Sequence, residues 1–175
     1  MESAGLTAGA NGDGFGYGVA RSGEDVVVVG YSEDSFFRLG IAEETPFCDQ
    51  PLNTTGFPGL LSMEGCDSLT GRTLTLHASQ LPPRTFARSF LGGEMPPVPY
   101  GDGYRCVGNP LFRLPSGSAD AAGEFRSAFD FDSPAGQELA PGSTWSFQVL
   151  YRDNNVFCKL QSFNLTNGLA VTFVP

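Results

Sequence analysis

The stretch S-T-W-S-F-Q-V-L-Y-R-D, residues 143–153, alternates large apolar side chains with other side chains at the two-residue period of a β-strand. One face of this strand carries Trp145, Phe147, Val149 and Tyr151. The other face carries Ser146, Gln148, Leu150 and Arg152. The pattern predicts a strand whose aromatic face lies against a hydrophobic core.

The same alternation recurs along the chain, and no long stretch has the 3.6-residue period of a helix. Further predicted strands lie within residues 24–32, 72–81, 84–93, 109–117, 123–132 and 168–175. The 23 glycines and 13 prolines are spread along the chain and favour short strands and turns. This spacing predicts an all-β fold, an antiparallel β-sandwich of the Ig-like or jelly-roll-like kind. Its predicted core contains Phe129, Trp145, Phe147, Tyr151 and Phe173.

A domain boundary is indicated by residues 45–59, T-P-F-C-D-Q-P-L-N-T-T-G-F-P-G, which mix proline, glycine and threonine. We therefore predict an acidic N-terminal β-hairpin arm over residues 1–45 and a disulfide-bonded β-sandwich over residues 46–175. The arm contains a run of four valines, Val26, Val27, Val28 and Val29. Such a run is poorly suited to an open edge, so we predict that it is added as a strand to the sandwich or to a second copy of the chain.

Charge limits the possible partners. The chain carries 10 basic and 19 acidic residues, a net charge of −9, and residues 1–50 alone have a net charge of −7. Without a basic stripe, nucleic acid is excluded as a partner and anionic membrane surfaces are disfavoured. The longest aliphatic run is the four valines, so no membrane insertion is expected.

The acidic residues favour solubility, with calcium binding as the alternative interpretation. Asp120, Asp130 and Asp132, in the segment 118–132, are the candidate oxygen ligands. Their spacing matches no EF-hand loop, so we expect no cofactor and keep calcium as the alternative.

Four cysteines, Cys48, Cys66, Cys106 and Cys158, favour two disulfides and a secreted or cell-surface location. Three pairings are possible, and we favour Cys48–Cys66 with Cys106–Cys158. A zinc site is disfavoured because the chain has no C-x-x-C pair and a single histidine.

Catalytic residue types are scarce. His77 is the only imidazole and no acidic residue adjoins it in sequence, which favours a structural or solvated histidine over a hydrolase base. Asp130 and Asp132 share a predicted strand face, as a glycosidase pair would, but an acidic strand face is more often only solvated. We expect no enzymatic activity, with a secreted hydrolase as the second alternative.

Sugar binding is the first alternative. Tyr100 and Tyr104 lie in the glycine-rich loop P-P-V-P-Y-G-D-G-Y-R-C, with Asp102 and Arg105 beside them as hydrogen-bonding groups. Exposed tyrosines stack on sugar rings, but packing over a disulfide at Cys106 is the favoured interpretation of these two. Asn53 and Asn164 begin N-x-T glycosylation sequons.

Two family resemblances accompany these patterns. F-C-D-Q-P-L-N-T-T-G-F-P-G-L-L-S-M-E-G-C, L-T-L-H-A-S-Q-L-P-P, G-D-G-Y-R-C, P-G-S-T-W-S-F-Q-V-L-Y-R-D and F-N-L-T-N-G-L-A-V-T-F occur in this order over residues 46–175. They resemble a C-terminal module of large secreted proteins from Planctomycetes and myxobacteria-like lineages. The resemblance implies a secreted β-sandwich and assigns no activity.

Upstream, N-G-D-G-F-G-Y-G-V-A-R-S-G-E-D-V-V-V-V-G, residues 11–30, resembles an FG-GAP repeat, the blade unit of integrin-type propellers. Only Asn11 and Asp13 stand where that family's calcium loop has its acids, and one repeat cannot form a propeller. The resemblance implies a blade-like hairpin.

Together, these patterns predict a non-catalytic extracellular structural or adhesion module. Its predicted partners are copies of itself, assembled into a filament by strand addition, or other cell-surface proteins. The alternative partner is a polysaccharide bound through the loop tyrosines.

Overall fold

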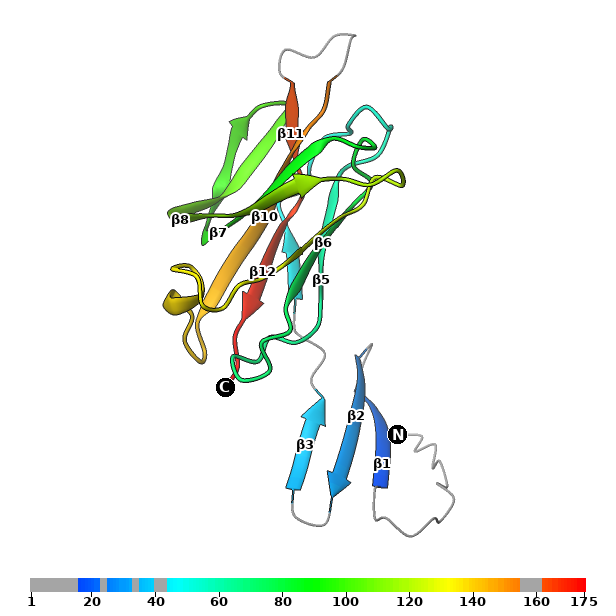
Figure 1. The fold of residues 1–175 in the computed structure, drawn as a ribbon, viewed down its shortest axis with the longest axis vertical. Coiled ribbons are helices and arrows are strands. Elements are labelled where there is room, and N and C mark those ends of the chain that lie inside the picture. The colour runs from blue at the N-terminus through cyan, green and yellow to red at the C-terminus, as the bar shows by residue number, and fades with distance from the viewer. Residues whose placement is uncertain (1–15, 23–24, 33–34, 40–43, 155–161) are drawn as a thin grey trace. The chain divides into compact units, whose positions relative to one another are not determined.

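The computed structural model describes residues 16–22, 25–32, 35–39, 44–154 and 162–175. The chain divides into two compact units, Met1–Ile41 and Ala42–Pro175 (Figure 1). The division falls slightly before the predicted boundary at residues 45–46. Strand β4 (Glu44–Phe47) spans that predicted boundary and pairs with a strand of the second unit.

The first unit contains an antiparallel sheet of order β1-β2-β3. Its strands are β1 (Gly16–Ser22), β2 (Asp25–Ser32) and β3 (Ser35–Leu39), so a third strand joins the predicted hairpin. The four valines lie in β2, the middle strand. Val28 pairs with Val19 on one side and Leu39 on the other, and Val29 pairs with Gly18 and Arg38. Adding this strand to another sheet would therefore require β1 or β3 to separate from it.

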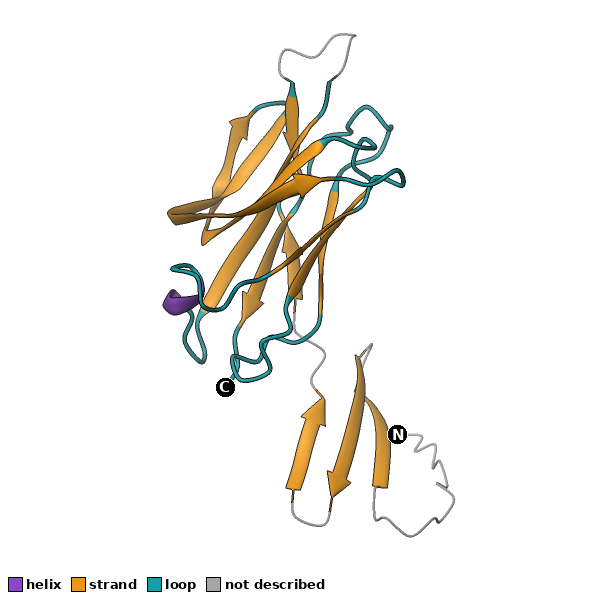
Figure 2. Cartoon of the chain, viewed as in Figure 1, coloured by secondary structure: helices purple, strands orange, loops and turns teal. Residues whose placement is uncertain are grey.

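The second unit consists of two antiparallel sheets. The larger has the order β4-β12-β10-β7-β8, with β11 also paired to β10, and the smaller has the order β5-β6-β9. The strands are β5 (Leu60–Glu64), β6 (Thr75–Ser79), β7 (Phe86–Tyr100), β8 (Gly103–Ser118), β9 (Phe125–Ala128), β10 (Thr144–Arg152), β11 (Phe163–Leu165) and β12 (Gly168–Thr172). Within the described residues, the only helical segment is the 3₁₀ turn Gly136–Glu138 (Figure 2).

The two sheets enclose one hydrophobic core, which confirms the predicted all-β sandwich. Phe147, Tyr151 and Phe173 are fully buried, as predicted from the alternating pattern. Phe129 is also buried, and its ring meets Phe147 edge-on with centroids 5.9 Å apart. Trp145 is only partly buried and packs against the core from its margin.

The β7–β8 hairpin folds back across the outer face of the larger sheet. β8 lies at one end of the strand order and β4 at the other, yet Cys106 of β8 forms a disulfide with Cys48, which directly follows β4. Three register shifts interrupt the β7–β8 pairing, and such bulges bend strands. Gly92 allows the close approach, since a Cβ there would lie 2.2 Å from the Gly108 carbonyl oxygen.

This disulfide makes both favoured cysteine pairings wrong. The Cα atoms of Cys48 and Cys106 are 6.3 Å apart, although the residues are 58 positions apart in sequence. Cys66 is a free thiol whose sulfur lies 3.1 Å from Thr73 Oγ1, and Cys158 lies outside the described residues. The predicted pairings joined cysteines that are neighbours in the sequence. They are wrong because the folded-back hairpin brings Cys106 to the opposite edge of the sheet.

A buried polar cluster closes one end of the sandwich. The Asn53 amide Nδ2 donates to the Gln80 carbonyl (2.7 Å) and to the Tyr151 hydroxyl (3.2 Å). Burial, and secondarily the charge of Asp153, raise the pKa of Tyr151 to about 12. Asn53 and Asn164 are both buried, so neither sequon is accessible in the folded chain.

Replacing both Cys48 and Cys106 with alanine should lower the free energy of unfolding by about 4 kcal/mol, because the crosslink restricts the unfolded chain. Urea denaturation at neutral pH measures the change. Cys66→Ser is the matched control and should shift stability by less than about 0.5 kcal/mol. Equal stability of the double variant and the wild type would contradict the crosslink.

Tyr151 should make the fold sensitive to alkali. Its pKa lies above the value of about 10 expected in the unfolded chain, so the stabilisation is complete below about pH 10 and is lost as pH rises through about 12. The loss should approach about 2–3 kcal/mol. Urea denaturation from pH 9 to 12 should show a weaker pH dependence for Tyr151→Phe than for the wild type. Tyr104→Phe, at an exposed tyrosine, should keep the wild-type dependence.

Candidate ligand-binding site

The outer face of the larger sheet carries a row of side chains beneath the folded-back hairpin. Gln148 of β10 pairs with Phe90 of β7, and Phe90 pairs with Arg113 of β8. Because Phe147 and Val149 point into the core, Gln148 and its cross-strand neighbours lie on the opposite face. The sequence placed Gln148 on a polar face, but only 1% of its surface is exposed. Both faces of β10 are covered.

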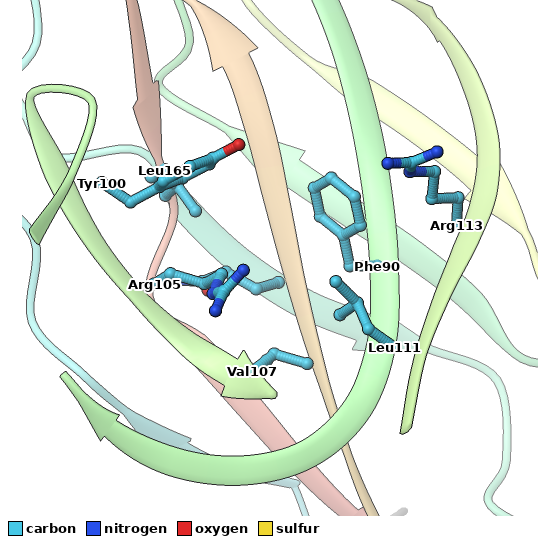
Figure 3. A pocket seen from close by; sticks show the side chains of 8 residues that line it. Phe90, Tyr100, Arg105, Val107, Leu111, Arg113 and Leu165 are labelled. Carbon is cyan, nitrogen blue, oxygen red and sulfur yellow. The ribbon is translucent and has the colours of Figure 1, made fainter. Parts of the chain in front are cut away.

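A cavity of about 120 Å³ lies between this row and the end of the hairpin. On the side of the larger sheet, the lining residues are Phe90 of β7, Leu111 and Arg113 of β8, Gln148 of β10 and Leu165 of β11. The folded-back hairpin end contributes Tyr100, Arg105 and Val107. In Figure 3 the hairpin curves beside the cavity, and Arg105 and Arg113 lie on opposite sides of Phe90.

Two glutamines hold the hairpin end in place. Gln148 Oε1 accepts the Cys106 N–H (3.1 Å), and its Nε2 donates to the carbonyl oxygens of Tyr104 and Thr166 (both 2.9 Å). Gln50 Oε1 accepts the Tyr104 N–H (2.8 Å), and its Nε2 donates to the Tyr104 carbonyl (3.1 Å). These bonds and the disulfide fix the backbone that carries Arg105.

Tyr100 is positioned by its neighbours. Its ring meets Phe163 edge-on, with centroids 5.1 Å apart, and the Arg105 guanidinium carbon lies 5.7 Å from the Tyr100 ring centroid. Gly101 has a φ of +67°, and a Cβ there would lie 2.3 Å from the Phe163 ring. This glycine therefore lets the turn bring Tyr100 onto Phe163. The ring retains 44% exposure, so a ligand can reach it.

The arginines around the cavity have no acidic partner within the described part of the chain. No ion pair among the described residues involves Arg105 or Arg113, and Arg105 Nε is buried without a hydrogen-bond acceptor. Arg88 and Arg152 lie on the same sheet face and donate to Ser116 Oγ (3.3 Å) and Ser162 Oγ (2.8 Å). In a chain of net charge −9, this face gathers positive charge.

The structure brings together part of the predicted sugar site. Tyr100 and Arg105 line the cavity, whereas Tyr104 and Asp102 do not. Tyr104 is next to Arg105 in β8 and so points to the other side of the strand. Sequence reasoning missed Phe90, Arg113 and Gln148, because they join the site only through the hairpin's return across the sheet.

His77 lies elsewhere, on the outer face of the smaller sheet. The sequence showed no acidic neighbour, but Glu64 Oε1 lies 3.5 Å from His77 Nδ1 and Glu124 Oε2 lies 3.6 Å from Nε2. Arg126 pairs with both carboxylates. Ser62 Oγ donates to the His77 backbone carbonyl (3.4 Å), so this hydroxyl is not activated by the imidazole. The arrangement is a cross-strand charge network.

The candidate calcium ligands are not brought together. Asp120 precedes β9, whereas Asp130 and Asp132 follow it, in a turn rather than on the predicted strand face. Asp120 Oδ1 accepts the Glu124 and Ala122 N–H groups, and these bonds lower its pKa. Asp130 Oδ1 accepts the Asp132 N–H (2.9 Å), and Asp132 pairs with Arg72 (2.6 Å).

Across the described part of the chain, no three His, Cys, Asp or Glu side chains are grouped to hold a metal ion. In the same residues, no helix has the length and apolar character needed to cross a bilayer.

Comparison of the chain with protein-family models, curated proteins and solved structures found no match. Both family resemblances therefore stay predictions. The described part of the first unit has three strands, whereas a propeller blade has four.

Replacing Gln148 with leucine should weaken the hairpin attachment, because the Cys106 N–H and the Thr166 carbonyl lose a buried partner. We expect the free energy of unfolding to fall by about 2–3 kcal/mol. The Cys106 amide should also exchange hydrogen faster. Gln137→Leu, at an exposed glutamine, should change neither quantity. Unchanged amide exchange in Gln148→Leu would contradict this role.

Proposed function

We propose that this chain is a non-catalytic extracellular adhesion module that binds polysaccharide in the cavity beneath the β7–β8 hairpin. The observation that carries the proposal is the combination, around one cavity, of Tyr100 and Phe90 with two arginines that form no ion pair with a described residue. Aromatic rings pack against the C–H faces of sugars, and guanidinium groups donate hydrogen bonds to their oxygens. The cavity offers both kinds of contact.

The size and openness of the cavity suit one sugar unit of a longer chain. Its volume of about 120 Å³ is smaller than the roughly 300–1,000 Å³ of pockets that enclose drug-sized ligands. Tyr100 and Arg113 are exposed at its margin, so a polymer can extend from the bound unit into solvent. A single site of this size suits reversible attachment.

Preorganisation supports binding as the role of the hairpin end. The disulfide, Gln148 and Gln50 hold its backbone before any ligand arrives. Little conformational entropy is then lost on binding, which favours affinity in a small contact area. The disulfide also supports an extracellular location, where such bonds persist.

The lining supports a role without catalysis. It contains no carboxylate, imidazole, thiol or aliphatic hydroxyl among the described residues. Gln148 is its one buried polar side chain, and that amide is already engaged with three backbone groups. Carboxylate, imidazole and thiol groups are the usual acid–base and nucleophilic groups, so this lining favours binding over catalysis.

Self-assembly through Val26, Val27, Val28 and Val29 is less well supported than ligand binding. β2 already has a hydrogen-bonded neighbour on each side, whereas strand addition uses an open edge. Strand exchange therefore remains a prediction of the sequence, and adhesion through the cavity is the function that we favour.

Tyr100→Ala should weaken glycan binding by at least about tenfold, because the exposed ring supplies the stacking surface. Tyr104→Ala is the matched control, since Tyr104 is 41% exposed in the same hairpin but does not line the cavity. A glycan array identifies the ligand and calorimetry measures the affinities. If no glycan binds the wild type, or if Tyr100→Ala binds as tightly as the wild type, the proposed function is wrong.

A further inference from the structure

Building on the proposed function, we infer that the cavity selects an acidic sugar and binds the carboxylate of a uronic acid unit through Arg105 and Arg113. The two side chains enter the cavity from opposite sides of Phe90 (Figure 3). Arg105 and Arg113 both border the space in which a sugar ring would lie against Phe90 and Tyr100, so a carboxylate attached to that ring has a guanidinium group beside it. The inferred ligand class is therefore a uronic-acid-containing polysaccharide.

The charge distribution is the first argument. The chain has almost twice as many acidic as basic residues, yet neither Arg105 nor Arg113 forms an ion pair with a described carboxylate. Asp102, only three positions from Arg105, is not paired with it either. By contrast, Arg72 and Arg126 are paired with acids. The cavity thus has two cationic groups that no described carboxylate neutralises.

The second argument is an unsatisfied donor. Arg105 Nε is buried and has no acceptor among the described residues, so this donor is not used within the described chain. The other N–H groups of a planar guanidinium match the oxygens of a carboxylate. The guanidinium also lies 5.7 Å from the Tyr100 ring centroid, a contact that fixes its position.

The third argument separates a sugar acid from other anions. A bare phosphate or sulfate has no apolar surface, whereas Phe90, Leu111, Val107 and Leu165 make much of the lining apolar. A sugar ring with an attached carboxylate presents a C–H face and an anionic group together, which fits both parts. The chain's net charge of −9 repels polyanions at long range, so binding must come from these short-range contacts.

The test compares polygalacturonate with the same polymer after its carboxyl groups are reduced to alcohols, by affinity electrophoresis and calorimetry. We expect the wild type to bind polygalacturonate at least about tenfold more tightly than the reduced polymer, because charge-assisted hydrogen bonds are lost. Arg105→Gln and Arg113→Gln should each cause a loss of similar size. Arg84→Gln, at an exposed arginine outside the cavity, changes the net charge equally and should bind as the wild type does.

The outcomes distinguish this inference from the proposed function. If the wild type binds both polymers equally and this binding still depends on Tyr100, the acid selectivity is overturned and glycan binding remains. Failure of every glycan to bind would overturn both. Two further ligands test the assignment to sugar carboxylates. The assignment would be wrong if the wild type bound dextran sulfate as tightly as polygalacturonate. It would also be wrong if polyglutamate bound as tightly and its binding depended on Arg105 and Arg113 in the same way. The comparison of ligands on the wild type keeps the test decisive even if an arginine variant misfolds.

Discussion

The candidate site depends on one constraint, the disulfide that links the two outermost strands of the larger sheet, β4 and β8. Cys48 follows β4 at one end, and Cys106 belongs to β8 at the other. In a flat sheet with these five strands in this order, the two cysteines would lie far apart, since neighbouring strands are separated by about 4.8 Å. The bond therefore requires the β7–β8 hairpin to return across the sheet. Register shifts and the close approach at Gly92 make that return sterically possible.

The return of the hairpin changes the environment of β10. In an ordinary two-sheet sandwich one face of such a strand would meet water, but here the second face is covered by the hairpin end. A buried face needs partners for its polar groups, and Gln148 meets this need by joining the backbones of β8 and the β11–β12 connection. The space left beside this glutamine is the cavity. The proposed binding site is thus a product of incomplete packing between a sheet and its own folded hairpin.

The sequence predicted what depends on local periodicity. The alternation at residues 143–153 correctly indicated a strand, its core face and the aromatic residues Phe147 and Tyr151. It could not indicate that Gln148 is buried, because the covering segment comes from elsewhere in the chain. The same limit explains the wrong cysteine pairings and the two glutamates beside His77. Tyr100 and Arg105 were found because they lie five residues apart in the sequence, in a segment that forms the tip of the β7–β8 hairpin. Phe90 and Arg113 required the tertiary fold.

The position of the disulfide also determines how the second unit would carry mechanical load. Tension applied along the chain from the N-terminal side first reaches β4, a short outer strand. Once β4 peels from β12, the pull passes at Cys48 directly into Cys106 through the sulfur–sulfur bond. Residues 49–105, which include Phe90, Tyr100 and Arg105, form a closed loop that bears no stretching force. In a tethered surface protein built in this way, most of the ligand-binding residues would be protected from the applied tension.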